Sequence, residues 1–285
     1  MIGSAMEKIG DRTSGVGRFS IGNTKRTRWT LSVIGVVSWL LLWQFVPRLL
    51  GLEARYFPTP VDVYTELDRI WEPVLRAIPP TLQAAIVGFL LSLVLSIVLG
   101  AFLVSNEAIL EALMPFIVGV NTVPRIAMTP LIIYWVGFIP VAWVDLWLAN
   151  YVMALWVAFF PMLIAAIDGF RDIDEDTENM LEVYGATEWQ AFKYVRFKNG
   201  LPFIFDGMKI GFILAMVGAV VGEFVSNTFG VGSMAASAIS RTSVSRAISI
   251  VLVLGFISAT VVFVIYVAES RIIFWRDSSV MGGEQ

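Results

Sequence analysis

Two charged side chains lie inside stretches of sequence that are otherwise apolar. Arg125 is the single charge in residues 113–136, and Glu223 comes near the end of another apolar stretch, just before the turn-rich sequence SNTFGVGS. Prolines near Arg125 free backbone carbonyl groups, and a charge at membrane depth must face protein or water. Such positions commonly belong to the route of a transported solute. The pattern therefore gives the following candidate pathway residues: Asn121, Pro124, Arg125, Met128 and Glu223.

Structural roles for the same residues stay open at this point. Arg125 could instead pair with Asp145 or Glu223, or could bind the carbonyl groups that the prolines free. Glu223 could act as a gate or as the pairing partner of another side chain. The sequence does not separate a pathway role from a pairing role for either residue.

Several kinds of catalysis are excluded by residues that the chain lacks. The sequence has 0 Cys and 0 His, which excludes a disulfide framework, thiolate or imidazole metal sites and a nucleophile activated by His. A GxxxxGK phosphate loop is also absent, so ATP hydrolysis on this chain is not expected. We therefore expect neither an enzyme nor a cofactor or metal bound to this chain.

The elements that must position these residues are membrane-spanning helices. The chain is 57% hydrophobic and 15% charged, with a mean hydropathy of +0.77, and is far more apolar than a soluble domain. About 20 helical residues cross a hydrocarbon core of about 30 Å, and backbone in lipid must satisfy its own hydrogen bonds. The net charge of −3 implies no nucleic-acid partner. We expect an all-α membrane protein with six spans: residues 30–47, 77–106, 113–136, 146–167, 203–225 and 247–268.

The distribution of Lys and Arg predicts which side each loop faces. With a cytoplasmic N-terminus, more basic residues flank the spans on the inner side than on the outer side, and both termini are then cytoplasmic. We expect a flexible tail at 1–28, a six-span domain at 29–270 and a second cytoplasmic tail at 271–285. The first apolar run lacks the layout of a signal peptide and is expected to be retained. Residues 57–80 predict a short amphipathic helix along the outer membrane surface.

The loop between the fourth and fifth spans, residues 168–201, is the longest polar loop on the inner side. Its first half is acidic and its second half is basic, which favours one or two short helices outside the membrane. Gly185 is the expected break between them, because a helix end often needs a left-handed residue. The loop also has an apolar face: Leu181, Tyr184, Ala186, Trp189 and Phe192. That face could fold back on the protein's own helices or dock in a groove of another protein, and spacing alone does not decide.

Small residues repeat every four positions along the fifth span. They are Gly207, Gly211, Ala215 and Ala219. Small side chains let helix backbones approach closely, so these positions predict a helix-packing face. We expect the face to slide during a conformational change, with static packing as the alternative.

Motifs in and around the polar loop resemble those of a known family of transport proteins. Part of the loop and of the fifth span resembles the "EAA" signature of binding-protein-dependent ABC importer permeases: Gly185, Ala186, Phe192, Val195, Leu201, Pro202, Ile204, Gly207 and Gly211. Two parts of the signature are not matched. Where the signature has E-A-A this chain has Asn, Met and Leu at 179–181, and where the signature has L-P it has Phe and Lys at 197–198. FPTPVDVYTEL, VNTVPRIAMTPLIIYWVGF and AVVGEFVSNTFGVGSMAASA resemble the subgroup for nitrate, sulfonate, taurine, bicarbonate and thiamine precursors.

The resemblance implies a type I ABC importer permease in the bacterial inner membrane. It implies that residues 178–197 form a coupling helix held in a cleft of a cytoplasmic ATPase, with these coupling residues: Glu178, Leu181, Glu182, Tyr184, Gly185, Ala186 and Trp189. The implied partners are two ATPase subunits that bind ATP and Mg²⁺, a second permease copy or a homologue, and an extracytoplasmic solute-binding protein. The implied solute is small, organic or inorganic, and similar to a sulfonate, nitrate or thiamine precursor. The alternative is a secondary transporter or channel without an ATPase, which intramembrane acids paired for ion coupling would favour.

Overall fold

The computed structural model describes residues 25–139 and 146–273, and every regular element within these residues is helical. The chain divides into two compact units, one ending at Val61 and the other beginning at Asp62. The expected tails fall largely outside the described residues, as does Asp145, one of the partners considered for Arg125.

The first unit contains one long helix, α2 (Lys25–Leu49). Its apolar part, Thr30–Leu49, is long enough to cross a membrane, and none of that stretch is buried. After the helix the chain turns at Gly51, and the Trp43 indole N–H donates a hydrogen bond to the Pro58 carbonyl at 3.0 Å. The expected first span is confirmed, and its uncovered apolar surface suits contact with lipid tails or another helix.

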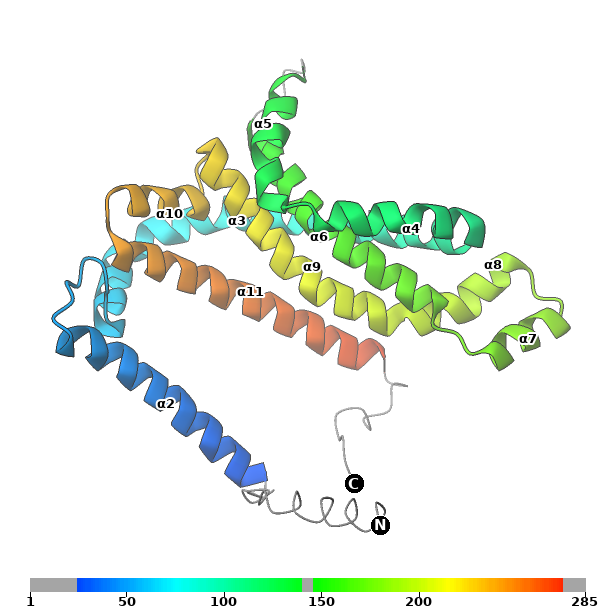
Figure 1. The fold of residues 1–285 in the computed structure, drawn as a ribbon, viewed down its shortest axis with the longest axis horizontal. Coiled ribbons are helices and arrows are strands. Elements are labelled where there is room, and N and C mark those ends of the chain that lie inside the picture. Colours follow the sequence, from blue (N-terminus) through cyan, green and yellow to red (C-terminus); the bar gives the residue numbers. More distant parts are fainter. Residues whose placement is uncertain (1–24, 140–145, 274–285) are drawn as a thin grey trace, which may run out of the picture. The chain divides into compact units, whose positions relative to one another are not determined.

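Four further helices are long and apolar enough to span a membrane: α3 (Pro60–Val104), α6 (Leu146–Arg171), α9 (Phe197–Ser226) and α11 (Val244–Ile272). A sixth span is formed by two pieces, α4 (Glu107–Thr122) and the segment Arg125–Gly137, which meet at an angle of 86°. The described residues therefore hold the six expected spans when this broken pair is taken as one. Figure 1 labels each of these elements along the chain.

The third span, expected at 113–136 with prolines inside it, is broken into two helices. Helix α4 begins at Glu107, and the helix breaks at Val123, whose φ of −61° and ψ of 133° are extended. The next residue is Pro124, and proline disfavours the helical conformation in the residue before it. A short 3₁₀ turn, η1 (Arg125–Met128), then leads into α5 (Thr129–Gly137). The proline signal was present in the sequence, and the structure shows that it turns the chain sharply.

The second span also differs from expectation, because the predicted surface helix is its first part. Helix α3 has 45 residues and continues through Pro73, Pro79 and Pro80. At 1.5 Å per residue it is roughly 68 Å long, more than twice the thickness of a hydrocarbon core. Its polar first third is therefore not needed to cross the apolar layer.

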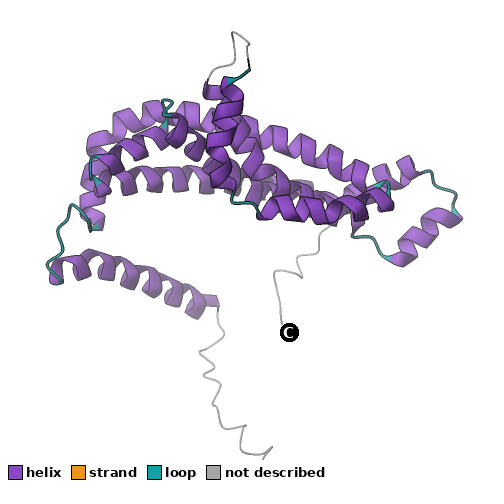
Figure 2. Ribbon diagram, turned by 45° about the horizontal axis from the view of Figure 1, so that its top comes forward, coloured by secondary structure: helices purple, strands orange, loops and turns teal. Residues whose placement is uncertain are grey.

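Helices α6 and α9 form the centre of the second unit and run side by side along most of their lengths (Figures 1 and 2). A buried cluster from α3, α6, α9, α10 (Val231–Ser240) and α11 surrounds them. The turn-rich sequence SNTFGVGS contains the non-helical residues 227–230, and helix α10, which was not expected, begins directly after them. The helix has only 10 residues and follows Asn227, which takes the left-handed conformation with a φ of 53°.

Candidate functional site

Two short helices project from the end of the α6–α9 pair. They are α7 (Glu175–Val183) and α8 (Glu188–Ala191), and the one-turn π-helix η2 (Phe192–Arg196) joins them to α9. We call residues 174–196 the α7–α8 unit. It lies within the polar loop that the sequence singled out. Because the loop joins α6 to α9, both ends of the unit are attached to the central helix pair.

Local signals in the sequence explain where α7 begins. The Asp174 side chain accepts hydrogen bonds from the Thr177 N–H at 3.3 Å and the Thr177 hydroxyl at 2.6 Å. The hydroxyl bond stabilises the carboxylate and lowers the pKa of Asp174 below its ordinary value. Three more acids fill the first turn, where they interact favourably with the helix dipole.

The break between the two helices is at Gly185, as predicted. Its φ is +66°, and the Gly185 and Ala186 amides donate to the Glu182 and Leu181 carbonyls, each at 2.9 Å. This is the left-handed helix ending for which glycine is best suited. Thr187 and Gln190 then form a reciprocal capping box that starts α8.

The predicted apolar face of the loop is only partly covered by the protein itself. Leu181, Ala186 and Phe192 are half-buried, whereas Tyr184 is 82% exposed and Trp189 is 68% exposed. Val183 beside them is 84% exposed. Large apolar side chains at such exposure on a polar helix commonly mark a surface that binds another protein.

The root of the unit is a tightly packed junction. Phe170, at the end of α6, is fully buried, and its ring lies 5.2 Å from that of Phe192 and 6.3 Å from that of Phe197. Gly169 and Gly200 bring the two backbones together, since a Cβ on Gly200 would lie 3.1 Å from the Gly169 carbonyl carbon. A displacement of the unit must therefore displace the ends of α6 and α9 with it.

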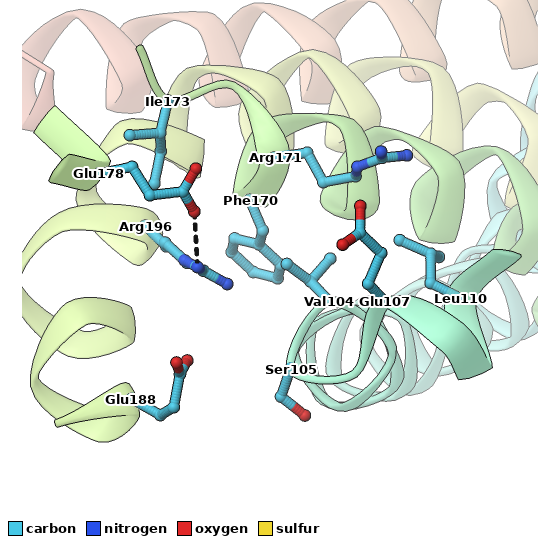
Figure 3. Close-up of a pocket in the computed structure, with 10 residues that line it drawn as sticks. All are labelled: Val104, Ser105, Glu107, Leu110, Phe170, Arg171, Ile173, Glu178, Glu188 and Arg196. Carbon is cyan, nitrogen blue, oxygen red and sulfur yellow. Dashed lines mark hydrogen bonds and ion pairs between the residues drawn. The ribbon is translucent and has the colours of Figure 1, made fainter. Parts of the chain in front are cut away.

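A pocket of about 350 Å³ separates the unit from the start of α4 (Figure 3). Arg196 and Glu178 form an ion pair of 3.1 Å at its edge, with Arg196 the less exposed partner. Glu107, Arg171 and Glu188 complete the charged part of its lining. The pair joins α7 to η2 at the edge of the pocket (Figure 3).

Four of the five predicted pathway residues lie together at the bend of the third span. The Arg125 guanidinium donates to the Asn121 side-chain oxygen at 2.6 Å, and both residues are half-buried. Met128 is half-buried and Pro124 is exposed at the same bend. The bend thus presents a polar pair within a chain of apolar helices.

Glu223 is not part of this group. It is fully buried on α9, where one carboxylate oxygen accepts from the Thr81 hydroxyl at 2.9 Å and from the Gly232 amide at 2.8 Å. It forms no ion pair with Arg125, although both residues lie in the described part of the chain. Sequence reasoning missed Thr81 and Gly232 as its partners, and the only local signal for them was the glycine-rich GVGS.

The small residues of the fifth span, Gly207, Gly211, Ala215 and Ala219, are all buried in the structure. A Cβ on Gly207 would lie 2.9 Å from the Ala165 Cβ, and one on Gly211 would overlap the Met162 side chain. Two of these four positions thus face α6 directly. They contribute to the close approach of the central pair.

Comparison with known proteins gives a consistent set of relatives. The family described as "Binding-protein-dependent transport system inner membrane component" matches residues 92–273. The chain is 27% identical to the formylaminopyrimidine transport permease protein ThiX of Halalkalibacterium halodurans, over 68% of this chain and 74% of the relative. It is 29% identical to the riboflavin transport system permease protein RibX of Chloroflexus aurantiacus, over 75% and 79%. It is 26% identical to the putative aliphatic sulfonates transport permease protein SsuC of Bacillus subtilis, over 89% and 90%.

Proposed function

We propose that this chain, which belongs to the family of inner-membrane components of binding-protein-dependent transport systems, forms half of the pathway of an ATP-driven importer. A second copy, or a homologue, supplies the other half. The sequence suggested a secondary transporter or channel as the alternative, and family membership favours the importer.

The α7–α8 unit is the proposed attachment point for a separate ATPase subunit. The observation that carries this assignment is the exposure of Val183, Tyr184 and Trp189 on a unit rooted in the central helix pair. A polar helix pair with an uncovered apolar face fits a groove of a partner protein. In this arrangement two ATPase subunits, one for each half of the pathway, bind and hydrolyse ATP with Mg²⁺. The α7–α8 unit and both chain termini face the cytoplasm.

Movement would pass from the unit to the spans as a rigid-body displacement. The packed root at Phe170 transmits a push on the unit to both α6 and α9. These two helices are closely packed along their length, so they move as one body. Such rocking is a common way to convert a local binding event into a change of access.

The bend at Arg125 is the proposed part of the pathway on this chain. Its guanidinium is fixed by Asn121 in an apolar setting, where it would attract an anionic or strongly polar group of a small solute. Relatives are named for solutes as different as riboflavin and aliphatic sulfonates. We therefore assign the choice of solute mainly to an extracytoplasmic binding protein that delivers it.

Replacement of Trp189 with Glu tests the attachment point. Trp189 is 68% exposed, so the change should leave the membrane domain folded while the partner groove rejects the charge. We expect the ATPase subunit encoded with this chain to be lost during purification. Tyr64→Glu is the matched control, since Tyr64 is 71% exposed on the polar part of α3. Retention of the ATPase at the wild-type ratio in Trp189→Glu would refute the assignment.

A further inference from the structure

A buried polar cluster lies at the end of the α6–α9 pair opposite the α7–α8 unit. Asn150 of α6 is fully buried and donates to the Thr228 hydroxyl at 2.8 Å, while Ser226 donates to the Asn150 side-chain oxygen at 3.2 Å. Glu223 of α9 lies one turn before Ser226. Buried polar groups are costly unless they are hydrogen-bonded, so a cluster of them implies a specific role.

Glu223 connects three elements within this cluster. Its Oε2 atom accepts from Thr81 of α3 and from the Gly232 amide in the first turn of α10. The Thr81 hydroxyl oxygen in turn accepts from the Val231 amide at 2.9 Å. The first amides of a helix have no partner within the helix and carry a partial positive charge. One carboxylate and one hydroxyl therefore satisfy the start of α10 and tie it to both α3 and α9.

The fit around the carboxylate leaves no room for a side chain. A Cβ on Gly230 would overlap the Glu223 carboxylate, and one on Gly232 would overlap the Val220 carbonyl oxygen. These contacts press the start of α10 against α9. The glycines of GVGS are thus explained by close approach to Glu223 and its neighbours.

The other carboxylate oxygen, Oε1, is buried without a hydrogen-bond partner among the described residues. An unsatisfied buried oxygen on an acid costs free energy that the fold must recover elsewhere. The geometry supplies the compensation, because the other carboxylate oxygen accepts two bonds at once, from Thr81 of α3 and from the Gly232 amide of α10. The acid thereby holds the start of α10 to two other helices.

We propose that Glu223 is a positioning residue that latches α10 to the α6–α9 pair, so that α10 follows that pair when the α7–α8 unit moves. The latch itself follows from the contacts of Thr81, Glu223 and Gly232, and the coupled movement rests on the proposed function. Helix α10 is then the element at the opposite end of the central pair that moves together with the α7–α8 unit.

The latch can be tested without partner subunits. Because the chain has 0 Cys, a single nitroxide label can be placed on α10 through Ile239→Cys, at a side chain that is 59% exposed. We expect Thr81→Val and Glu223→Gln each to raise the ratio of mobile to immobile label about tenfold, since Thr81→Val removes one buried hydrogen bond to Glu223 and Glu223→Gln weakens the acceptor of two. Thr81→Ser keeps the hydroxyl and should match the unsubstituted protein. Identical spectra for all four proteins would overturn the latch.

The coupled movement needs the assembled transporter. With partner subunits in vesicles, Thr81→Val and Glu223→Gln should retain the ATPase subunit but transport less solute per ATP hydrolysed, and Thr81→Ser should keep the normal ratio. A mobile α10 combined with an unchanged ratio would overturn the role of α10 in coupling. If the unsubstituted chain binds no ATPase, the proposed function fails, and the label spectra still decide whether Glu223 holds α10.

Discussion

Replacement of Gly218 with Ala should destabilise the central helix pair through contact with backbone atoms. A Cβ at Gly218 would lie 2.6 Å from the Met153 carbonyl oxygen and 2.8 Å from the Ala154 Cα atom. Backbone atoms of a packed helix cannot rotate away as a side chain can. The whole of α6 must therefore shift, or α9 must move off it.

A matched variant separates the cost of the backbone contact at position 218 from the general effect of replacing Gly with Ala in a helix. Over-packing of a close contact costs about 1–3 kcal/mol, and Ala is favoured over Gly inside a helix by about 0.8–1.0 kcal/mol. Gly255 on α11 has no atom within 4 Å of an added Cβ, so Gly255→Ala should show only the favourable part. The difference between the two variants is then the packing cost alone.

A third variant tests whether the kind of neighbouring atom decides the outcome. An added Cβ at Gly211 would meet the Met162 side chain, whose thioether is flexible and can adopt another rotamer. We expect the stability of Gly211→Ala to fall between that of Gly218→Ala and that of Gly255→Ala.

Thermal unfolding of the purified membrane domain in detergent provides the measurement. In soluble domains of 150–250 residues, 1 kcal/mol corresponds to about 2–4 °C in melting temperature. Gly218→Ala should therefore melt several degrees below Gly255→Ala, with Gly211→Ala between them. Equal melting temperatures for Gly218→Ala and Gly255→Ala would refute the close packing of α6 on α9.

Two shorter predictions concern the bend and the α7–α8 unit. Arg125→Ala should abolish solute uptake while the ATPase subunit still co-purifies. Arg125→Lys keeps the charge but not the planar guanidinium, so it should recover part of the uptake. Full uptake in Arg125→Ala would favour a purely structural role for Arg125. Gly185→Ala should destabilise the turn between α7 and α8 by about 1–2 kcal/mol, because its φ of +66° is unfavourable for residues with a Cβ. Limited proteolysis should then cut residues 174–196 faster than in the unsubstituted protein. Cleavage at the wild-type rate would show that the left-handed turn is dispensable.

Much of the fold follows from the sequence because membrane spans are local features. Each apolar run must become a helix in lipid whatever its neighbours are, and the runs that begin near residues 30 and 247 correspond to α2 and α11. The break at Gly185 was predictable for the same reason, since a left-handed helix ending depends on a few consecutive residues.

Features that depend on distant contacts were not predictable. One carboxylate oxygen of Glu223 accepts a hydrogen bond from Thr81, which lies 142 positions away in the sequence. The sequence could place an acid near the end of a span but could not supply this partner, so a gate, a pathway residue and a pairing residue stayed open. The angle of 86° at Val123–Pro124 has the same origin, because proline breaks a helix locally while tertiary packing sets the direction of the next segment.

The packing of α9 differs between its two sides, and this bears on which helices can move. Toward α6, Gly218 approaches the opposing backbone closely. Toward α11, a largely apolar groove of about 840 Å³ opens to the surface, lined by Gly255, Ser258 and Ala259 among others.

Polar contacts hold the two ends of α11 rather than its middle. Ser249 donates to the Val63 carbonyl at 2.8 Å near one end, and Lys209 and Glu269 form an ion pair of 2.6 Å near the other. A contact that is bordered by an open groove has fewer packed atoms than a close-packed one and deforms at lower cost. The geometry thus weighs against sliding along the small residues of the fifth span and favours rearrangement between α9 and α11, with α6 and α9 kept together as the body that carries both the α7–α8 unit and Glu223.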